Sequence, residues 1–261
     1  MRIARFTTGD EEPRFAAVGE DQTGETVLAV LEGDPLYRAP KLTGEKAALP
    51  DVRLLAPVIP RSKVVGAGRN YAEHAAELGN EVPSAPVLFF KPNTSVIGPD
   101  EPIVLPRQSS EVHYEAELAV VIGRVCKDVP PERVPDVVFG YTCANDVTAR
   151  DLQELDGQWT RAKGFDSFCP LGPWIETDLN PSDLAIRCLV GEDVRQDGRT
   201  AQMIYDVTAL VTYISAAFTL LPGDVILTGT PAGVGPLAVG DEVTVSIEDI
   251  GALTNRVVVS S

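Results

Sequence analysis

The sequence has 261 residues, of which 44% are hydrophobic, so it can bury one large core or one core with a small appendage. Its 38 acidic residues outweigh 22 Lys and Arg, and the net charge of -16 predicts neither a nucleic-acid partner nor an anionic membrane surface. No apolar run approaches the ~20 residues of a membrane span, no secretory signal is visible, and the four cysteines form no C-x-x-C pair, so we expect a cytoplasmic protein.

Residues 1–60 are predicted to form a small β-rich N-terminal module. Short apolar and β-branched runs, separated by acidic or glycine-rich turns, predict strands at residues 3–6, 15–18, 26–30 and 52–58. The last run leads to Pro60, a natural boundary. Residues 61–261 are then expected to form one larger domain.

Strand patterns also dominate this larger domain. They fall at residues 63–66, 87–90, 102–105, 117–122, 185–190, 224–228 and 242–247. Two helices are predicted, at 71–78 and 208–220, and the first has Asn70 as a good N-cap and Gly79 as a good stop. Turn-rich links and many strands favour a mixed, mostly β fold over alternating βαβ units.

Three carboxylates are the candidates for a metal site. Glu115 and Glu117 lie in the run 113–121, which alternates and ends in β-branched residues, so it is predicted to be a strand with both glutamates on one face. Asp146 follows later, in the run 141–146. Buried carboxylates need an offsetting charge, and all-oxygen ligands suit Mg²⁺, Mn²⁺ or Ca²⁺ rather than zinc. The alternative is an edge strand with its acidic face in water.

Two further segments carry groups suited to catalysis. On a helix, His74 and Glu77 share a face, so the carboxylate could orient the imidazole as a general base; the alternative is an exposed surface pair. Lys163 is either a site lysine or a surface lysine. Residues 228–235 pack glycines around two hydroxyls, which either lets backbone amides approach a ligand oxygen or forms a plain turn.

Taken together, these segments resemble the fumarylacetoacetate hydrolase superfamily. The matching strings span about residues 63 to 258, and they are 68–74 (GRNYAEH), 114–118 (YEAEL), 145–153 (NDVTARDLQ), 163–166 (KGFD), 170–173 (PLGP) and 222–235 (PGDVILTGTPAGVG). Within the superfamily the chain looks most like bacterial 2-hydroxyhepta-2,4-diene-1,7-dioate isomerase-like members and acylpyruvase or oxaloacetate decarboxylase-like members.

The resemblance implies a fold and a cofactor. Residues 61–261 would form the mostly β catalytic domain of this family, a β-sandwich or β-roll with few short helices, and the protein would be a homodimer. Glu115, Glu117 and Asp146 would bind Mg²⁺ or Mn²⁺, with Ca²⁺ able to take its place. His113 lies on the same predicted strand face and is either a fourth ligand or support for the other ligands.

It also implies roles for other side chains. His74 and Glu77 would form a catalytic dyad on a lid helix, and Lys163 would be an active-site lysine. Because an isolated helix of this length is marginal in water, we expect residues 70–84 to be mobile without ligand and to order over the metal when substrate binds.

Substrate contacts and reaction follow from the same resemblance. The substrate would be a small 2-oxo or β-diketo acid, bound by Arg69, Gln153 and Thr230. Arg69 and Thr230 would contact its carboxylate, and Gln153 would also contact the closed lid. The expected reaction is C–C bond hydrolysis or decarboxylation of the acylpyruvate or oxaloacetate type through a metal-bound enolate. One alternative is 2-hydroxyhepta-2,4-diene-1,7-dioate isomerisation in aromatic catabolism, and a remote one is a non-catalytic metal-binding scaffold.

Overall fold

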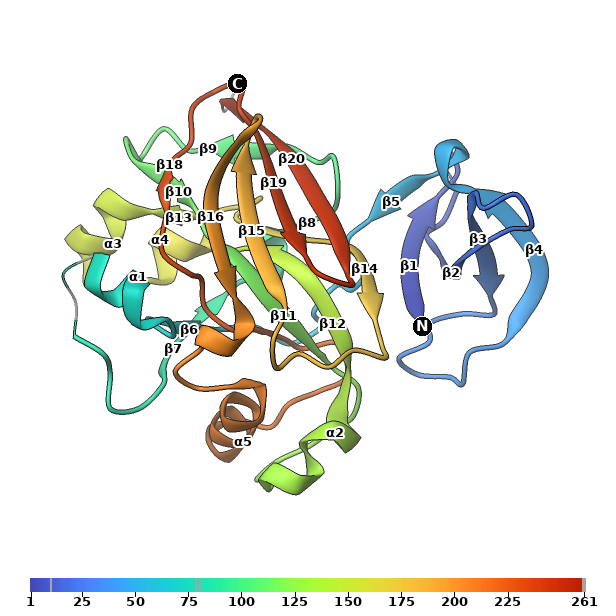
Figure 1. Ribbon diagram of the computed structural model, residues 1–261, viewed down its shortest axis with the longest axis horizontal. Coiled ribbons are helices and arrows are strands. Elements are labelled where there is room, and N and C mark those ends of the chain that lie inside the picture. The colour runs from blue at the N-terminus through green and yellow to red at the C-terminus, as the bar shows by residue number, and fades with distance from the viewer. Residues whose placement is uncertain (10, 78, 80, 260–261) are drawn as a thin grey trace.

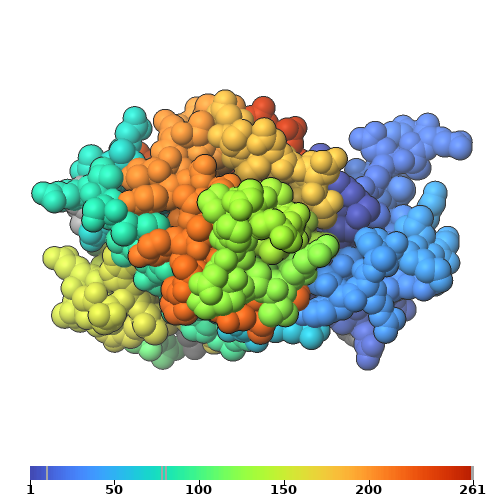
Figure 2. Space-filling view, turned by 90° about the horizontal axis from the view of Figure 1, so that it is seen from below, coloured from blue at the N-terminus to red at the C-terminus, as the bar shows by residue number. Residues whose placement is uncertain are grey.

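The computed structural model describes residues 1–9, 11–77, 79 and 81–259 (Figure 1). Within these residues the chain is mostly strand with a few short helices, so the predicted mixed, mostly β fold is confirmed. Figure 2 shows the N-terminal residues gathered at one end of the molecule, beside the larger body.

The N-terminal strands form a meander with its own small core. They are β1 (Arg2–Thr7), β2 (Arg14–Glu20), β3 (Thr26–Leu31), β4 (Leu42–Ala48) and β5 (Arg53–Leu55). Alternate residues of β1 to β3, among them Phe6, Ala16 and Leu28, are buried together. The predicted strands are present, but β4 was missed because its side chains are almost all exposed and include Glu45 and Lys46. The boundary at residue 60 stays a prediction.

These strands extend a larger sheet, because β1 pairs with β14 (Cys169–Glu176). The sheet runs in the order β4-β3-β2-β1-β14-β12-β11-β17-β6-β7, with β5 beside β1 and β8 beside β14. Its remaining strands are β6 (Val64–Gly68), β7 (Val87–Lys91), β8 (Val96–Ile97), β11 (Ala116–Ile122), β12 (Val138–Asn145) and β17 (Val225–Leu227).

Two smaller sheets complete the β structure of the described residues. The five-stranded sheet has the order β16 (Asp193–Arg199), β15 (Ala185–Val190), β19 (Glu242–Ile247), β20 (Gly251–Val259), β9 (Ile103–Leu105). The three-stranded sheet has the order β13 (Thr148–Ala149), β10 (Val112–Tyr114), β18 (Gly235–Pro236).

The main core lies between the large sheet and the five-stranded sheet. Figure 1 shows the five-stranded sheet lying across the middle of the large one. Leu118 and Val120 of β11 pack there with Ile186 and Val245, while Val121 faces a second cluster behind the sheet. Since strand residues alternate between faces, Glu117 is on the side of Val121, away from the main core. The fold thus leaves this carboxylate free to face a cavity.

The helices are short. They are α1 (Ala72–Glu77), α2 (Val134–Val137), α3 (Arg150–Asp156), α4 (Thr160–Gly164) and α5 (Val207–Ala217). The two predicted helices appear as α1 and α5, although Leu78, the predicted end of the first, lies outside the described residues. Helices α2 to α4 were not predicted, because four to seven residues carry little periodicity. Among the described residues, no helix has the length and apolar character needed to cross a membrane.

Candidate active site

The chain breaks its strand at Glu115. The run 113–121, predicted as one strand, is divided between β10 and β11, which belong to different sheets, so that part of the prediction was wrong. At the break, the Glu115 N–H donates to Asn145 Oδ1 at 2.9 Å, and its carbonyl accepts from the Asp146 N–H at 2.9 Å. These two bonds tie the ends of the strands that carry the three carboxylates.

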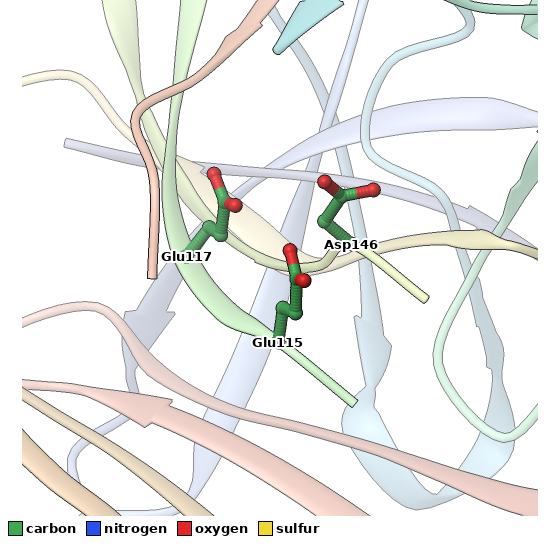
Figure 3. Close-up of side chains that lie close together, drawn as sticks. All are labelled: Glu115, Glu117 and Asp146. Carbon is green, nitrogen blue, oxygen red and sulfur yellow. The ribbon is translucent and has the colours of Figure 1, made fainter. Parts of the chain in front are cut away.

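The three candidate metal ligands do converge. Glu115, Glu117 and Asp146 are 4%, 2% and 0% exposed, so the alternative of an acidic face in water does not hold. One carboxylate oxygen from each lies within 4.8 Å of the others, and Figure 3 shows the three groups turned toward one another. Burial raises the pKa of Glu117 well above its usual range, and the charges of Asp146 and Glu115 raise it further. A buried cluster of this kind can hold a hard cation.

Lys163 lies against this cluster. Its ammonium donates to Glu115 Oε2 at 2.8 Å and to Asp146 Oδ2 at 2.5 Å, and its side chain is 3% exposed, which excludes the surface-lysine alternative. Burial lowers the pKa of Lys163, but the two carboxylates outweigh burial and the pKa is raised. Lys163 therefore stays charged and neutralises part of the cluster.

Two further cations at the site were missed by the sequence analysis. Lys91, at the end of β7, is fully buried and donates to Asp146 Oδ1 and, at 3.2 Å, to the Val147 carbonyl. Arg150 donates to Glu115 Oε1 from the start of α3. Burial alone would raise the pKa of Glu115, but Lys163 and Arg150 hold it below its usual range. The available signals were a lysine ending an apolar strand and an arginine inside the 145–153 string.

His74 and Glu77, predicted as a catalytic dyad, lie together on α1. His74 Nδ1 lies 3.4 Å from Glu77 Oε2, and His74 is 5% exposed, so this is not an exposed surface pair. The Glu77 carboxylate also accepts from the Gly233 N–H, at 3.1 and 3.2 Å. Burial lowers the pKa of His74, and the charge of Arg150 acts in the same direction. The imidazole is therefore neutral near neutral pH, as a general base must be.

These groups share one cavity of about 530 Å³. Of the predicted site residues, those that line it are His74, Glu115, Glu117, Asp146, Lys163, Arg69, Gln153 and Thr230. Glu77 does not line it and reaches it only through His74. Gln153 Oε1 accepts from Arg150 at 2.9 Å, so Gln153 is held by the guanidinium that also holds Glu115.

Arg69 lies on an aromatic wall of the cavity. Its backbone has φ +58°, and its guanidinium is 5.8 Å from the centre of the Trp159 ring. Gly68 must be glycine, because a Cβ there would lie 2.5 Å from the same ring. Arg69 therefore lies at the cavity wall, beside Trp159.

The glycine-rich segment approaches the cluster from another side. The Gly229 N–H donates to Glu117 Oε2 at 2.6 Å, and a Cβ on Gly229 would lie 2.7 Å from Asn70 Cβ. The segment is thus more than a plain turn, because one of its backbone amides binds a carboxylate of the cluster. His113 Nε2 contacts Glu111 Oε1 at 3.0 Å, and His113 is not among the clustered ligands of the described residues, which favours support over fourth-ligand coordination.

Two family models match the chain. Residues 63–258 match the model described as fumarylacetoacetate (FAA) hydrolase C-terminal, and residues 1–57 match the one described as Rv2993c-like, N-terminal. Among curated proteins, Protein Rv2993c of Mycobacterium tuberculosis is 54% identical over 261 residues, which cover 99% of this chain and 98% of that protein. Oxaloacetate tautomerase Fahd2a, mitochondrial, of Rattus norvegicus is 40% identical over 248 residues, covering 91% of this chain and 78% of that protein.

Solved structures agree in fold. The 2-hydroxyhepta-2,4-diene-1,7-dioate isomerase from Mycobacterium marinum has a TM-score of 0.91 at 50% identity, covering 100% of this chain and 99% of that one. The maleylpyruvate hydrolase from Sphingobium sp. SYK-6, in complex with manganese (II) ion and pyruvate, has a TM-score of 0.81 at 33% identity, with 100% of both chains covered. The chain therefore belongs to the fumarylacetoacetate hydrolase family, whose members are enzymes, and the predicted resemblance is confirmed.

Proposed function

We propose that the protein is a divalent-metal-dependent enzyme that interconverts enol and keto forms, or double-bond isomers, of a small 2-oxo acid through an enolate. The observation that carries the proposal is the buried cluster Glu115, Glu117 and Asp146 in one cavity with the buried imidazole of His74. The relatives named as isomerase and tautomerase, at 50% and 40% identity, support this reaction type.

The donor set supports Mg²⁺ or Mn²⁺ as the cofactor. The three carboxylates are hard oxygen ligands, and their mutual repulsion is offset when they share a cation. When bound there, the cation would polarise the 2-oxo group of the substrate and stabilise negative charge on its oxygen. The related hydrolase in complex with manganese (II) ion and pyruvate supports the same cofactor class.

The charge of the site supports an enolate in particular. With a divalent cation bound, all three carboxylates would be ionised and would offset the three cations Lys91, Lys163 and Arg150, so the side chains together would add no net charge. A divalent cation would leave two positive charges. The 2-oxo carboxylate end of the substrate carries one negative charge, and the enolate of that end carries two. The electrostatic balance of the site therefore favours the enolate over the substrate, which is what lowers the barrier to forming it.

The protein side chains divide the remaining work. His74, neutral and oriented by Glu77, takes a proton from carbon 3 while the electron pair moves to the 2-oxo oxygen, and then returns the proton to oxygen or to another carbon. Lys163 and Arg150 offset the charge of the carboxylate cluster. Arg69 and Thr230 contact the carboxylate of the substrate, and Gln153 lines the same cavity beside Arg150.

C–C bond hydrolysis or decarboxylation of an acylpyruvate or oxaloacetate is the second candidate. The His74–Glu77 pair favours hydrolysis, because an oriented neutral imidazole can activate a water molecule. The likeness to a maleylpyruvate hydrolase at 33% identity also supports it. In decarboxylation no water attacks, and the pair would only manage protons.

One set of assays separates these reactions. The purified protein with Mg²⁺ or Mn²⁺ is offered oxaloacetate, 2-hydroxyhepta-2,4-diene-1,7-dioate, acetylpyruvate and fumarylpyruvate. A product with the same elemental composition as its substrate supports isomerisation. Release of a smaller carboxylic acid or of CO₂ supports the second candidate. No turnover of any 2-oxo acid would leave the non-catalytic scaffold.

A further inference from the structure

Gln196 is a fully buried side chain that bridges two parts of the site. It lies on β16, in the five-stranded sheet, and is 0% exposed. Its Oε1 accepts from the Ala116 N–H at 2.9 Å, at the residue between the two glutamates of the cluster. Its Nε2 donates to Thr230 Oγ1 at 2.8 Å and to the Pro231 carbonyl at 2.8 Å.

The orientation of this amide has only one solution. A backbone N–H can only donate and a backbone carbonyl can only accept, so Ala116 requires the oxygen of Gln196 and Pro231 requires its nitrogen. The nitrogen must therefore face Thr230, and the Thr230 hydroxyl oxygen must accept. The hydroxyl proton is left for another partner.

That partner is not a protein group in the part of the chain that the structure describes. The hydrogen bonds found for the described residues give the Thr230 hydroxyl only the bond that it accepts from Gln196. Thr230 is 2% exposed and lines the main cavity. A buried hydroxyl whose proton has no protein acceptor beside a ligand cavity is suited to donate to an acceptor on the ligand.

The bridge has little freedom to move. Around Gln196, β16 lies tightly against the segment after Thr230: a Cβ on Gly198 would be 2.7 Å from Pro231 Cβ, and one on Gly233 would be 2.2 Å from the Arg195 carbonyl oxygen. Strand β16 and the segment after Thr230 are therefore in contact without space for a further methyl group. The amide of Gln196 holds Thr230 at a set position relative to the strand of Glu115 and Glu117.

We propose that Gln196 is a positioning residue that makes Thr230 a hydrogen-bond donor and thereby selects a carboxylate oxygen of the ligand. Gln196 acts through Thr230 and does not itself line the cavity. The inference rests on the proposed function, because it takes the ligand to be the carboxylate of a 2-oxo acid.

The test is a double-mutant cycle on oxalate binding to the full-length, Mn²⁺-loaded protein, measured by calorimetry. Thr230→Val loses the hydroxyl donor and should weaken oxalate binding about ten- to a hundredfold. Thr230→Ser keeps the hydroxyl and should bind oxalate as tightly as the wild-type protein. Gln196→Met should weaken binding in the wild-type background but add nothing to Thr230→Val. Mn²⁺ affinity, measured separately, should hold in all variants.

Asn255→Leu is the matched control. Asn255 is a buried amide of the same sheet that donates to the Gly98 and Glu101 carbonyls at 2.9 and 2.8 Å and does not line the cavity. The Asn255→Leu substitution should lower thermal stability without changing the affinity for oxalate. If wild-type protein with Mn²⁺ takes no oxalate, the proposed function and this inference both fall. If oxalate binds but Gln196→Met has no effect, or has the same effect in both backgrounds, only this inference falls.

Discussion

The N-terminal region and the candidate site share one sheet, but their ion pairs differ in burial: they are exposed in the first and buried in the second. In the loop between β3 and β4 of the N-terminal region, Lys41 and Glu32 pair at 2.8 Å with side chains 72% and 47% exposed. At the candidate site, Lys91, which does not line the cavity, pairs with Asp146, and both side chains are fully buried. Exposed pairs stabilise a fold little, whereas buried charges carry a desolvation cost that a hydrophobic core would avoid. The clustered buried charges of the candidate site are therefore better explained by chemistry than by stability.

Removing a cavity carboxylate should have the largest effect. Glu115→Ala, Glu117→Ala and Asp146→Ala should each abolish turnover and weaken Mn²⁺ binding, because each removes a charged ligand. Glu45→Ala, at an exposed acid of β4, is the control and should change neither. Full activity in excess chelator, or wild-type Mn²⁺ affinity in all three cavity variants, would contradict the metal site.

Loss of the base should come next. His74→Ala should lower kcat by the ~10²–10⁴ typical of a missing general base while Mn²⁺ affinity holds, because His74 is not in the ligand cluster. His113→Ala is the comparison, and it should cost less because His113 pairs with Glu111. Kinetics on each substrate and Mn²⁺ calorimetry measure both. Wild-type rates in His74→Ala would remove it from the mechanism.

Substituting one lysine in each region compares the stability effects of a buried and an exposed ion pair. Lys91→Met leaves the buried charge of Asp146 short of a partner and should cost about 3 kcal/mol in the free energy of unfolding, in urea with excess chelator. Lys41→Met should cost less than about 1 kcal/mol. Added Mn²⁺ should recover part of the loss in Lys91→Met only. Equal losses in the two variants would mean that burial does not distinguish these pairs.

The pH profile should show the lowered pKa of His74. Burial disfavours the imidazolium, so the base is neutral and active above its folded pKa and is lost as pH falls through it. The acidic limb of kcat/KM, which reports groups of the free enzyme, should therefore lie below 6.5, the ordinary histidine value. That limb should vanish in the residual activity of His74→Ala. A limb above the ordinary value would contradict the desolvated imidazole.

The smallest effect expected is on the lid. Amide exchange across residues 70–84 should slow when oxalate and Mg²⁺ are added, because α1 is short and Glu77 docks on the Gly233 N–H. Leu78 and Asn80 of this stretch lie outside the described residues, so the lid stays a prediction. Amides of α5 serve as the unaffected reference. Equal protection with and without ligand would mean a preformed site without gating.

Local patterns in the sequence were enough for much of the fold. The β15 and β19 strands have the predicted bounds. A strand with one buried face has apolar residues at every second position, and this alternation is visible in the sequence. Polar β4 and short α3 lack that signal, because pairing with neighbouring elements rather than an apolar face forms them.

The division is the same at the site. Sequence and family resemblance were sufficient to propose Glu115, Glu117 and Asp146 as a group. The groups that support them were decided only by the tertiary structure: Lys91 meets Asp146 across 55 residues, Arg150 meets Glu115 across 35, and Gln196 meets Ala116 across 80. A buried charge or amide resembles a surface residue in sequence, because its partner is chosen by packing and carries no local pattern.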